Sequence, residues 1–191
     1  GIKEALIVGA KNSVANTSKE GGFNNNPLIK IPFPKDASKI KTTLLKAGMR
    51  SQVDRFEYVL NEAAEDASNF AKEIFIDAIK NITINDVILI LEGREDAATA
   101  YLKTQTSKEL YVKFKPFVKN SIEKVNLTKY WTSLSEIYNQ IPLTKEVNTD
   151  LEDYITNQAI EGLFILVAKE EKNIRNNPEA RVSEILQKVF K

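Results

Sequence analysis

Residues 50–79 read RSQVDRFEYVLNEAAEDASNFAKEIFIDAI, and this stretch decides the fold class. Its apolar positions recur at alternating steps of three and four residues, which is the spacing of one face of an α-helix. These positions are Val53, Phe56, Leu60, Ala63, Ala67, Phe70 and Ile74. Large side chains alternate with alanines, so a partner helix can approach closely. Because the seam is only about three heptads long, a two-stranded coiled coil is not expected. The stretch predicts one long helix inside a bundle.

Helical spacing extends over most of the remaining chain. Further helices are expected over residues 2–18, over residues 36–48 as a short helix capped by Asp36, and over residues 150–176 as a long helix at the centre. Shorter helices are expected between residues 83 and 142 and after Pro178. The first of them begins at the potential cap Thr83, the next spans residues 96–102, and another begins at Ser107. Pro116 should kink or restart one of them. Residues 22–34 contain three prolines and predict an extended, Pro-rich strap across the surface.

The length and composition predict a single all-α domain. The 191 residues, 42% of them hydrophobic, suffice for one compact core and are too few for two average domains. We expect eight or nine helices and roughly 70% helix. In this interpretation residues 1–35 form the N-terminal helix and the strap, and residues 36–191 form the helical body.

The chain has no His and no Cys. This excludes disulfides, thiol nucleophiles, Ser-His-Asp catalysis, and zinc or haem sites that depend on these residues. A ferritin-like di-iron site needs Glu-x-x-His motifs and is excluded too. Carboxylate, Lys, Tyr and Ser/Thr chemistry remains. We therefore assign no catalytic residue, no metal ligand and no cofactor, and an enzyme is less expected than a protein without catalysis.

Charge is unevenly distributed along the chain. Residues 1–50 carry nine Lys/Arg and three Asp/Glu, a net +6, whereas residues 51–110 carry twelve Asp/Glu and six Lys/Arg, a net −6. The favoured interpretation is that the two regions pair within the fold, and the alternative is that the basic N-terminal segment associates with an anionic membrane surface. Residues 108–124 combine lysines with aromatic residues, but helical spacing places the aromatic residues on the core side. Nucleic acid is not an expected partner.

Two carboxylates lie among apolar sequence neighbours, Asp77 and Glu161. A carboxylate in such surroundings must be paired, hydrogen-bonded or protonated, and the favoured role is to cap a neighbouring helix or bind an Arg. The chain has only five Arg residues, so these positions are the ones where a planar, bidentate donor matters. We expect Arg175 and Arg181 to form buried or partly buried salt bridges with carboxylates such as Asp77 or Glu161.

Several short stretches occur together in a fixed order. They are Gly21-Gly22-Phe23, Asn26-Pro27-Leu28-Ile29-Lys30-Ile31-Pro32, Ile74-Phe75-Ile76-Asp77-Ala78-Ile79, Ala97-Ala98-Thr99-Ala100-Tyr101, Phe114-Lys115-Pro116, Gly162-Leu163-Phe164, and Glu170-Glu171-Lys172 through Ile174-Arg175, Pro178 and Arg181. Taken together, they resemble the bacterial domain-of-unknown-function family 4197 over essentially the whole chain. The resemblance implies a mainly helical domain, usually made with an export or lipoprotein signal in Gram-negative bacteria, and it implies no established activity. It favours Asp77, Thr99, Arg175 and Arg181 as positions of a shared polar site.

Three classes of function follow from these observations. A non-catalytic binding or structural module of the cell envelope, periplasmic or membrane-anchored, is favoured; it predicts an exposed apolar or charged patch, near the strap, for a protein partner. A carrier of a small apolar or amphipathic ligand is the alternative, and it needs an apolar cavity of at least about 300 Å³. An enzyme would need Asp77 or Glu161 to open onto a cleft beside Thr99, Tyr101 or a Lys. Because the chain begins with Gly1, we expect any export signal to have been removed.

Overall fold

The computed structural model describes residues 1–85, 87–145, 147 and 149–189. Within these residues the protein is 75% helical, with nine α-helices and no strand, which confirms the all-α class. The α-helices are α1 (Ile2–Thr17), α2 (Ser38–Lys46), α3 (Arg50–Ser68), α4 (Ala71–Asn81), α5 (Val87–Glu92), α6 (Ala97–Lys124), α7 (Leu127–Asn139), α8 (Leu151–Asn176) and α9 (Glu184–Val189). Two short 3₁₀ helices are η1 (Lys35–Ala37) and η2 (Pro178–Ala180).

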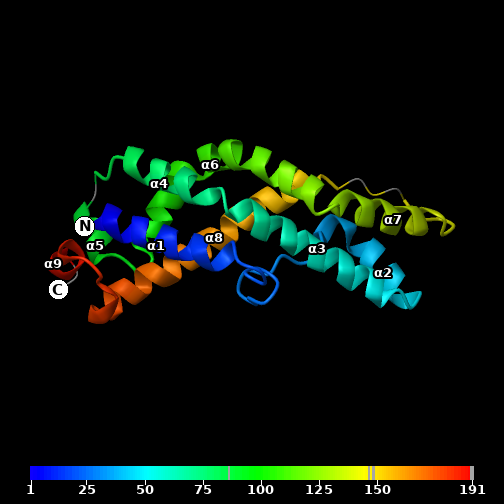
Figure 1. Ribbon diagram of the computed structural model, residues 1–191, viewed down its shortest axis with the longest axis horizontal. Coiled ribbons are helices and arrows are strands. Elements are labelled where there is room, and N and C mark those ends of the chain that lie inside the picture. Colours follow the sequence, from blue (N-terminus) through cyan, green and yellow to red (C-terminus); the bar gives the residue numbers. More distant parts are fainter. Residues whose placement is uncertain (86, 146, 148, 190–191) are drawn as a thin grey trace.

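Helix α8 is the central element, as expected. It packs along α1 on one side and α6 on the other, while α3 contacts α6, α7 and α8. The bundle is elongated (Figure 1): α2 and α7 lie at one end, and α5, α9 and the N-terminus lie at the other. Asp150 caps α8 by accepting a hydrogen bond from the Asp153 amide at 2.9 Å, which fixes the predicted start of this helix.

The predicted single helix over residues 53–79 is two helices, α3 and α4, separated at Asn69 and Phe70. The Ser68 hydroxyl donates to the Ala64 carbonyl at 2.8 Å, and the side-chain amide of Asn69 donates to the Asp66 carbonyl at 3.0 Å. Side chains that bind these carbonyls compete with the helical backbone pattern. Phe70 is consequently not a core residue of the seam; it is 48% exposed and stacks on Phe117 with ring centroids 4.7 Å apart.

The opposite difference occurs at α6, where two predicted helices are one. Residues 97–124 form a continuous helix that includes Pro116, so this proline does not restart it. Pro116 is exposed, and so is Val112, whose carbonyl would otherwise accept the missing amide hydrogen bond. Because both residues face solvent, water can satisfy that carbonyl at low cost.

The predicted strap is also different. Residues 22–29 form successive turns rather than an extended chain, and four side chains of the segment enter the core. These are Phe23, Ile29, Ile31 and Phe33, each at most 5% exposed. Gly22 and Gly162 permit this packing: a Cβ on Gly22 would lie 2.3 Å from the Thr17 carbonyl oxygen, and one on Gly162 would lie 3.1 Å from Phe23. The segment is therefore part of the core.

Two predicted helix caps are wrong as well. Asp36 lies in η1 and does not cap α2; it accepts a hydrogen bond from the Thr149 hydroxyl at 3.1 Å. The described part of α5 starts at Val87, later than the predicted cap Thr83, and the Thr83 carbonyl accepts a hydrogen bond from Tyr101 instead.

Candidate functional site

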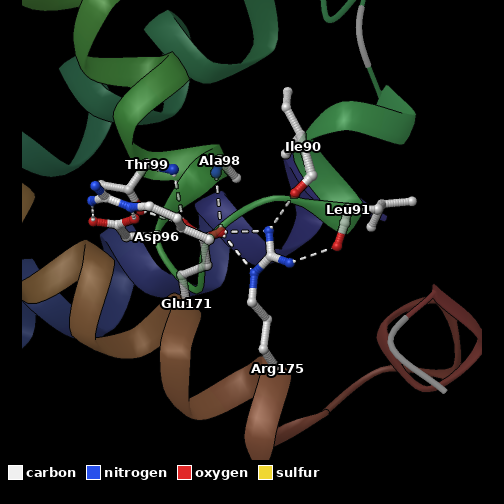
Figure 2. Close-up of polar contacts among 8 residues, drawn as sticks. Ile90, Leu91, Asp96, Ala98, Thr99, Glu171 and Arg175 are labelled. Carbon is white, nitrogen blue, oxygen red and sulfur yellow. Dashed lines mark hydrogen bonds and ion pairs between the residues drawn. The ribbon is translucent and has the colours of Figure 1, made fainter.

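A buried ion pair on α8 joins the ends of two other helices (Figure 2). Glu171 is 2% exposed and accepts hydrogen bonds from the Ala98 amide at 3.0 Å, the Thr99 amide at 2.8 Å and the Thr99 hydroxyl at 2.6 Å. Arg175, one turn further along α8, donates to Glu171 at 2.9 Å. Its other nitrogens donate to the Leu91 carbonyl at 3.0 Å and the Ile90 carbonyl at 2.9 Å.

This arrangement caps α5 and α6 from outside. The amides of Ala98 and Thr99 lie in the first turn of α6, where the helix itself supplies no acceptor for them. The carbonyls of Ile90 and Leu91 lie in the last turn of α5. A carboxylate at a helix N-terminus and a guanidinium at a helix C-terminus each stabilise the local helix dipole. One i, i+4 pair on α8 therefore closes the corner between α5 and α6.

The residue expected to cap α6 from its own sequence has another partner. Asp96 is the N-cap residue, but its side chain makes no cap hydrogen bond. Instead Arg94 donates to both of its oxygens, at 2.7 and 3.1 Å. These hydrogen bonds hold the pKa of Asp96 below its ordinary value. Glu171 takes over the capping position that Asp96 leaves open.

The structure brings two of the five predicted site residues together. Thr99 and Arg175 both bind Glu171. Arg181 lies beside this cluster, and its guanidinium donates to the carbonyls of Ile174 at 3.0 Å and Arg175 at 2.9 Å. The hypothesis that Arg175 forms a partly buried salt bridge is confirmed, with Glu171 rather than Asp77 or Glu161 as its partner. The expected carboxylate partner of Arg181 is wrong; Arg181 binds backbone carbonyls in the last turn of α8.

The other two predicted residues lie outside this cluster. Asp77 is exposed on α4, and Glu161 is exposed on α8, where it forms an ion pair with Lys103 at 2.5 Å. Neither carboxylate is buried, so the expectation from their apolar sequence neighbours is wrong. Glu161, Lys103 and Thr99 do line one shallow groove of about 250 Å³. The Thr99 hydroxyl in this groove already donates to Glu171.

Sequence reasoning missed Glu171 although a signal was present. It lies four residues after Val167 and three before Ile174, and both of these residues are buried. Glu171 therefore occupies a position of the apolar stripe of α8. A carboxylate at a stripe position, with Arg one turn later, indicates a buried ion pair more reliably than apolar sequence neighbours do.

A second buried carboxylate fixes the turns that follow α1. Glu65 of α3 is 6% exposed and accepts hydrogen bonds from the backbone amides of Phe23 and Asn24 at 3.0 and 2.9 Å, and from Gly21 at 3.2 Å. One turn earlier, the Asn61 side chain exchanges two hydrogen bonds with the backbone of Ile31, at 2.8 and 2.9 Å. Glu65 and Asn61 thus hold the 21–31 segment against α3. Sequence reasoning missed both residues.

Several large aliphatic residues are exposed on α5 and α9, and these two helices lie at the same end of the bundle (Figure 1). Ile88 and Leu89 are 69% and 68% exposed, and Val87 and Ile185 are also exposed. We call these four residues the aliphatic end. Among the described residues of the 22–34 segment, Leu28 is the large hydrophobic residue with high exposure. An interaction patch near this segment stays a prediction.

The described residues contain no group of three or more His, Cys, Asp or Glu side chains placed to hold a metal ion. No helix among them combines the length and apolar character needed to cross a bilayer.

The fold and these contacts define a helical domain whose buried polar residues are used to close helix ends and turns. The chain belongs to the family described as "Protein of unknown function (DUF4197)", which it matches over residues 1–191. No curated protein and no solved structure matches it.

Proposed function

We propose that this protein is a non-catalytic binding module of the cell envelope and that it binds through the aliphatic end. The observation that carries the proposal is the run Val87, Ile88 and Leu89, three consecutive large aliphatic residues on the surface of α5. Single exposed hydrophobic residues are ordinary on protein surfaces, but a run of three exposed aliphatic residues on one short helix is uncommon unless it serves binding. Ile185 of α9 extends the same end of the molecule.

The use of the buried carboxylates supports a role without catalysis. A general base needs a free lone pair near a substrate. Glu171 and Glu65, the two buried carboxylates of the described residues, accept backbone amide hydrogen bonds instead. Glu161 is accessible, but Lys103 already pairs with it on a groove smaller than the usual ligand site.

A carrier of an amphipathic ligand is the second candidate. A groove of about 400 Å³ opens at the aliphatic end, and it is lined mainly by aliphatic side chains. Its volume lies in the range of small-molecule sites. The binding module and the carrier therefore share one location on the molecule.

The envelope location rests on the family resemblance, which implies an export or lipoprotein signal. Association of the basic N-terminal segment with a membrane remains a second proposal. Residues 1–50 and 51–110 do pair within the fold through Lys41 and Glu57, and this contact removes one of the charges available to a membrane.

The test is native mass spectrometry of the protein purified from its own host, with two variants. The double variant I88K/L89K replaces the two most exposed large hydrophobic residues of α5, and V112K changes a residue that is 64% exposed on α6. We expect a bound species with the unmodified chain and with V112K, and its loss with I88K/L89K. Equal retention by both variants would show that the aliphatic end is not the binding surface.

A further inference from the structure

The groove at the aliphatic end is lined mainly by aliphatic side chains. Its side walls come from α1, α5, α9 and the segment between α4 and α5. The aliphatic lining residues are Ile2, Ile84, Val87, Leu91 and Val189; Gly1 completes the described lining, and Lys3 is the residue with a charged side chain. Among these described lining residues none is aromatic, and none offers a hydroxyl or amide side chain. They therefore supply no side-chain partners for a ligand that needs stacking or several directed hydrogen bonds, such as a nucleotide or a sugar.

Lys3 adds one defined polar contact at the wall of this groove. Its ammonium donates to the Lys80 backbone carbonyl at 2.8 Å, and this hydrogen bond positions the ammonium. An ammonium has three donor hydrogens, so this contact leaves donors for an anionic group. An aliphatic surface next to one positioned cation is complementary to an amphiphile with a hydrocarbon chain and a negative head.

We propose that this groove binds a single acyl chain, with Lys3 contacting the anionic head group. The proposal rests on the proposed function, because it names the ligand of the same aliphatic end. A second protein is a poorer fit, since protein interfaces depend on aromatic, Met and Arg anchors, which the groove lining lacks. A volume of about 400 Å³ also matches a small ligand rather than a protein segment.

Binding of a chain in an aliphatic groove has a characteristic dependence on length. Each methylene group removed from water should tighten binding about fourfold until the groove is full. Beyond that length the affinity should level off. A non-specific, detergent-like association would instead continue to strengthen with chain length.

The experiment is a calorimetric titration of the full chain with octanoate, decanoate and dodecanoate, and with 1-dodecanol as the uncharged probe. We expect dodecanoate to bind more tightly than octanoate and more tightly than dodecanol. K3M should remove the preference for the charged head and leave dodecanol binding unchanged. V87E should weaken dodecanoate at least tenfold, whereas I165E, at a similarly exposed residue on α8, should change it less than twofold.

Three outcomes would overturn the inference: no dependence on chain length, equal binding by V87E and the unmodified chain, or an equal loss in I165E. Because V87E alters an exposed residue, circular dichroism can confirm that it folds, and the chain-length series needs no variant.

Co-sedimentation with phosphatidylglycerol vesicles identifies the source of the acyl chain. Vesicle binding that V87E abolishes indicates a bilayer lipid, and dodecanoate binding without vesicle binding indicates a free amphiphile. If I88K/L89K loses a co-purified protein but no alkanoate binds, this inference fails while the proposed function stands.

Discussion

Substitution E171A should cost this protein about 3–5 kcal/mol of its free energy of unfolding. The carboxylate is 2% exposed and accepts from the Ala98 and Thr99 amides, the Thr99 hydroxyl and Arg175. Its removal leaves three donors without this acceptor and takes the Glu171 charge away from a guanidinium that is only 10% exposed. A domain of this size is stable by roughly 5–15 kcal/mol, so E171A should fold with a small margin or not at all.

The controls are substitutions of Glu161, an exposed carboxylate on α8, and of Arg175, the ion-pair partner of Glu171. E161A breaks the ion pair with Lys103, in which both side chains are nearly half exposed, and should cost less than about 1 kcal/mol. R175M leaves Glu171 with its three donors from α6 and should cost about 2 kcal/mol. The double variant E171A/R175M should cost less than the sum of its parts, because the two side chains interact directly and each single change already removes that interaction.

Urea unfolding followed by far-ultraviolet circular dichroism measures these differences, with E161A examined alongside. The decisive comparison is between E171A and E161A. If their unfolding free energies lie within 1 kcal/mol of each other, Glu171 does not close the α5–α6 corner in the way described, and the capping argument is refuted.

Three further predictions concern other contacts. The Tyr154 hydroxyl donates to the Pro32 carbonyl at 2.8 Å, and burial, with the charges of Asp36 and Glu57, raises its pKa to about 12. An unfolded Tyr ionises near pH ~10, so the stability that the Tyr154 hydroxyl contributes is complete below pH ~10 and is lost as the pH rises through 12. The Tm advantage of the unmodified chain over Y154F should therefore be smaller at pH 11 than at pH 8. A constant Tm difference would contradict the assignment. E65A should release the 21–31 segment and speed tryptic cleavage after Lys30 several-fold, whereas E73A, on exposed α4 surface, should not. G162A should lower Tm, because its Cβ would lie 3.1 Å from Phe23. G9A should raise Tm, because its Cβ would have an ordinary nearest contact of 3.4 Å and alanine favours the helix more than glycine does. The opposite order of the two Tm values would disprove the packing described.

The long helices could be predicted because their signals are local. The N-cap Asp150 and the end of the apolar stripe define α8 within the sequence itself, and the structure has the helix at these positions. The break between α3 and α4 could not be predicted in this way. It contains neither Gly nor Pro, and it depends on side chains of Ser68 and Asn69 that bind carbonyls of the preceding turn.

The buried carboxylates were assigned to the wrong positions for a geometric reason. Residues adjacent in sequence lie on different faces of a helix, and only those three or four apart share a face. Asp77 has apolar neighbours on both sides, yet it shares its face with Glu73 and Lys80, which are exposed. The helical period, rather than the local composition, therefore decides which carboxylate is buried.

The choice of partner could not be derived from the sequence at all. Glu171 binds amides 73 and 72 residues away, at Ala98 and Thr99. A backbone amide is the same group in every residue, so no side-chain pattern identifies which helix end a buried carboxylate will cap. Only the packing of α6 on α8 brings these groups together.

The same observation bears on where function can reside. Glu171 and Glu65 each stabilise a turn or helix end through backbone amides, and a change at either position acts on the fold. The aliphatic end is different, because Ile88 and Leu89 are largely exposed and contribute little to the core. Substitutions there should leave the unfolding free energy within about 0.5 kcal/mol of the unmodified chain. A variant that loses binding while it keeps full stability should therefore map to α5 and the groove behind it, and not to the conspicuous ion pair on α8.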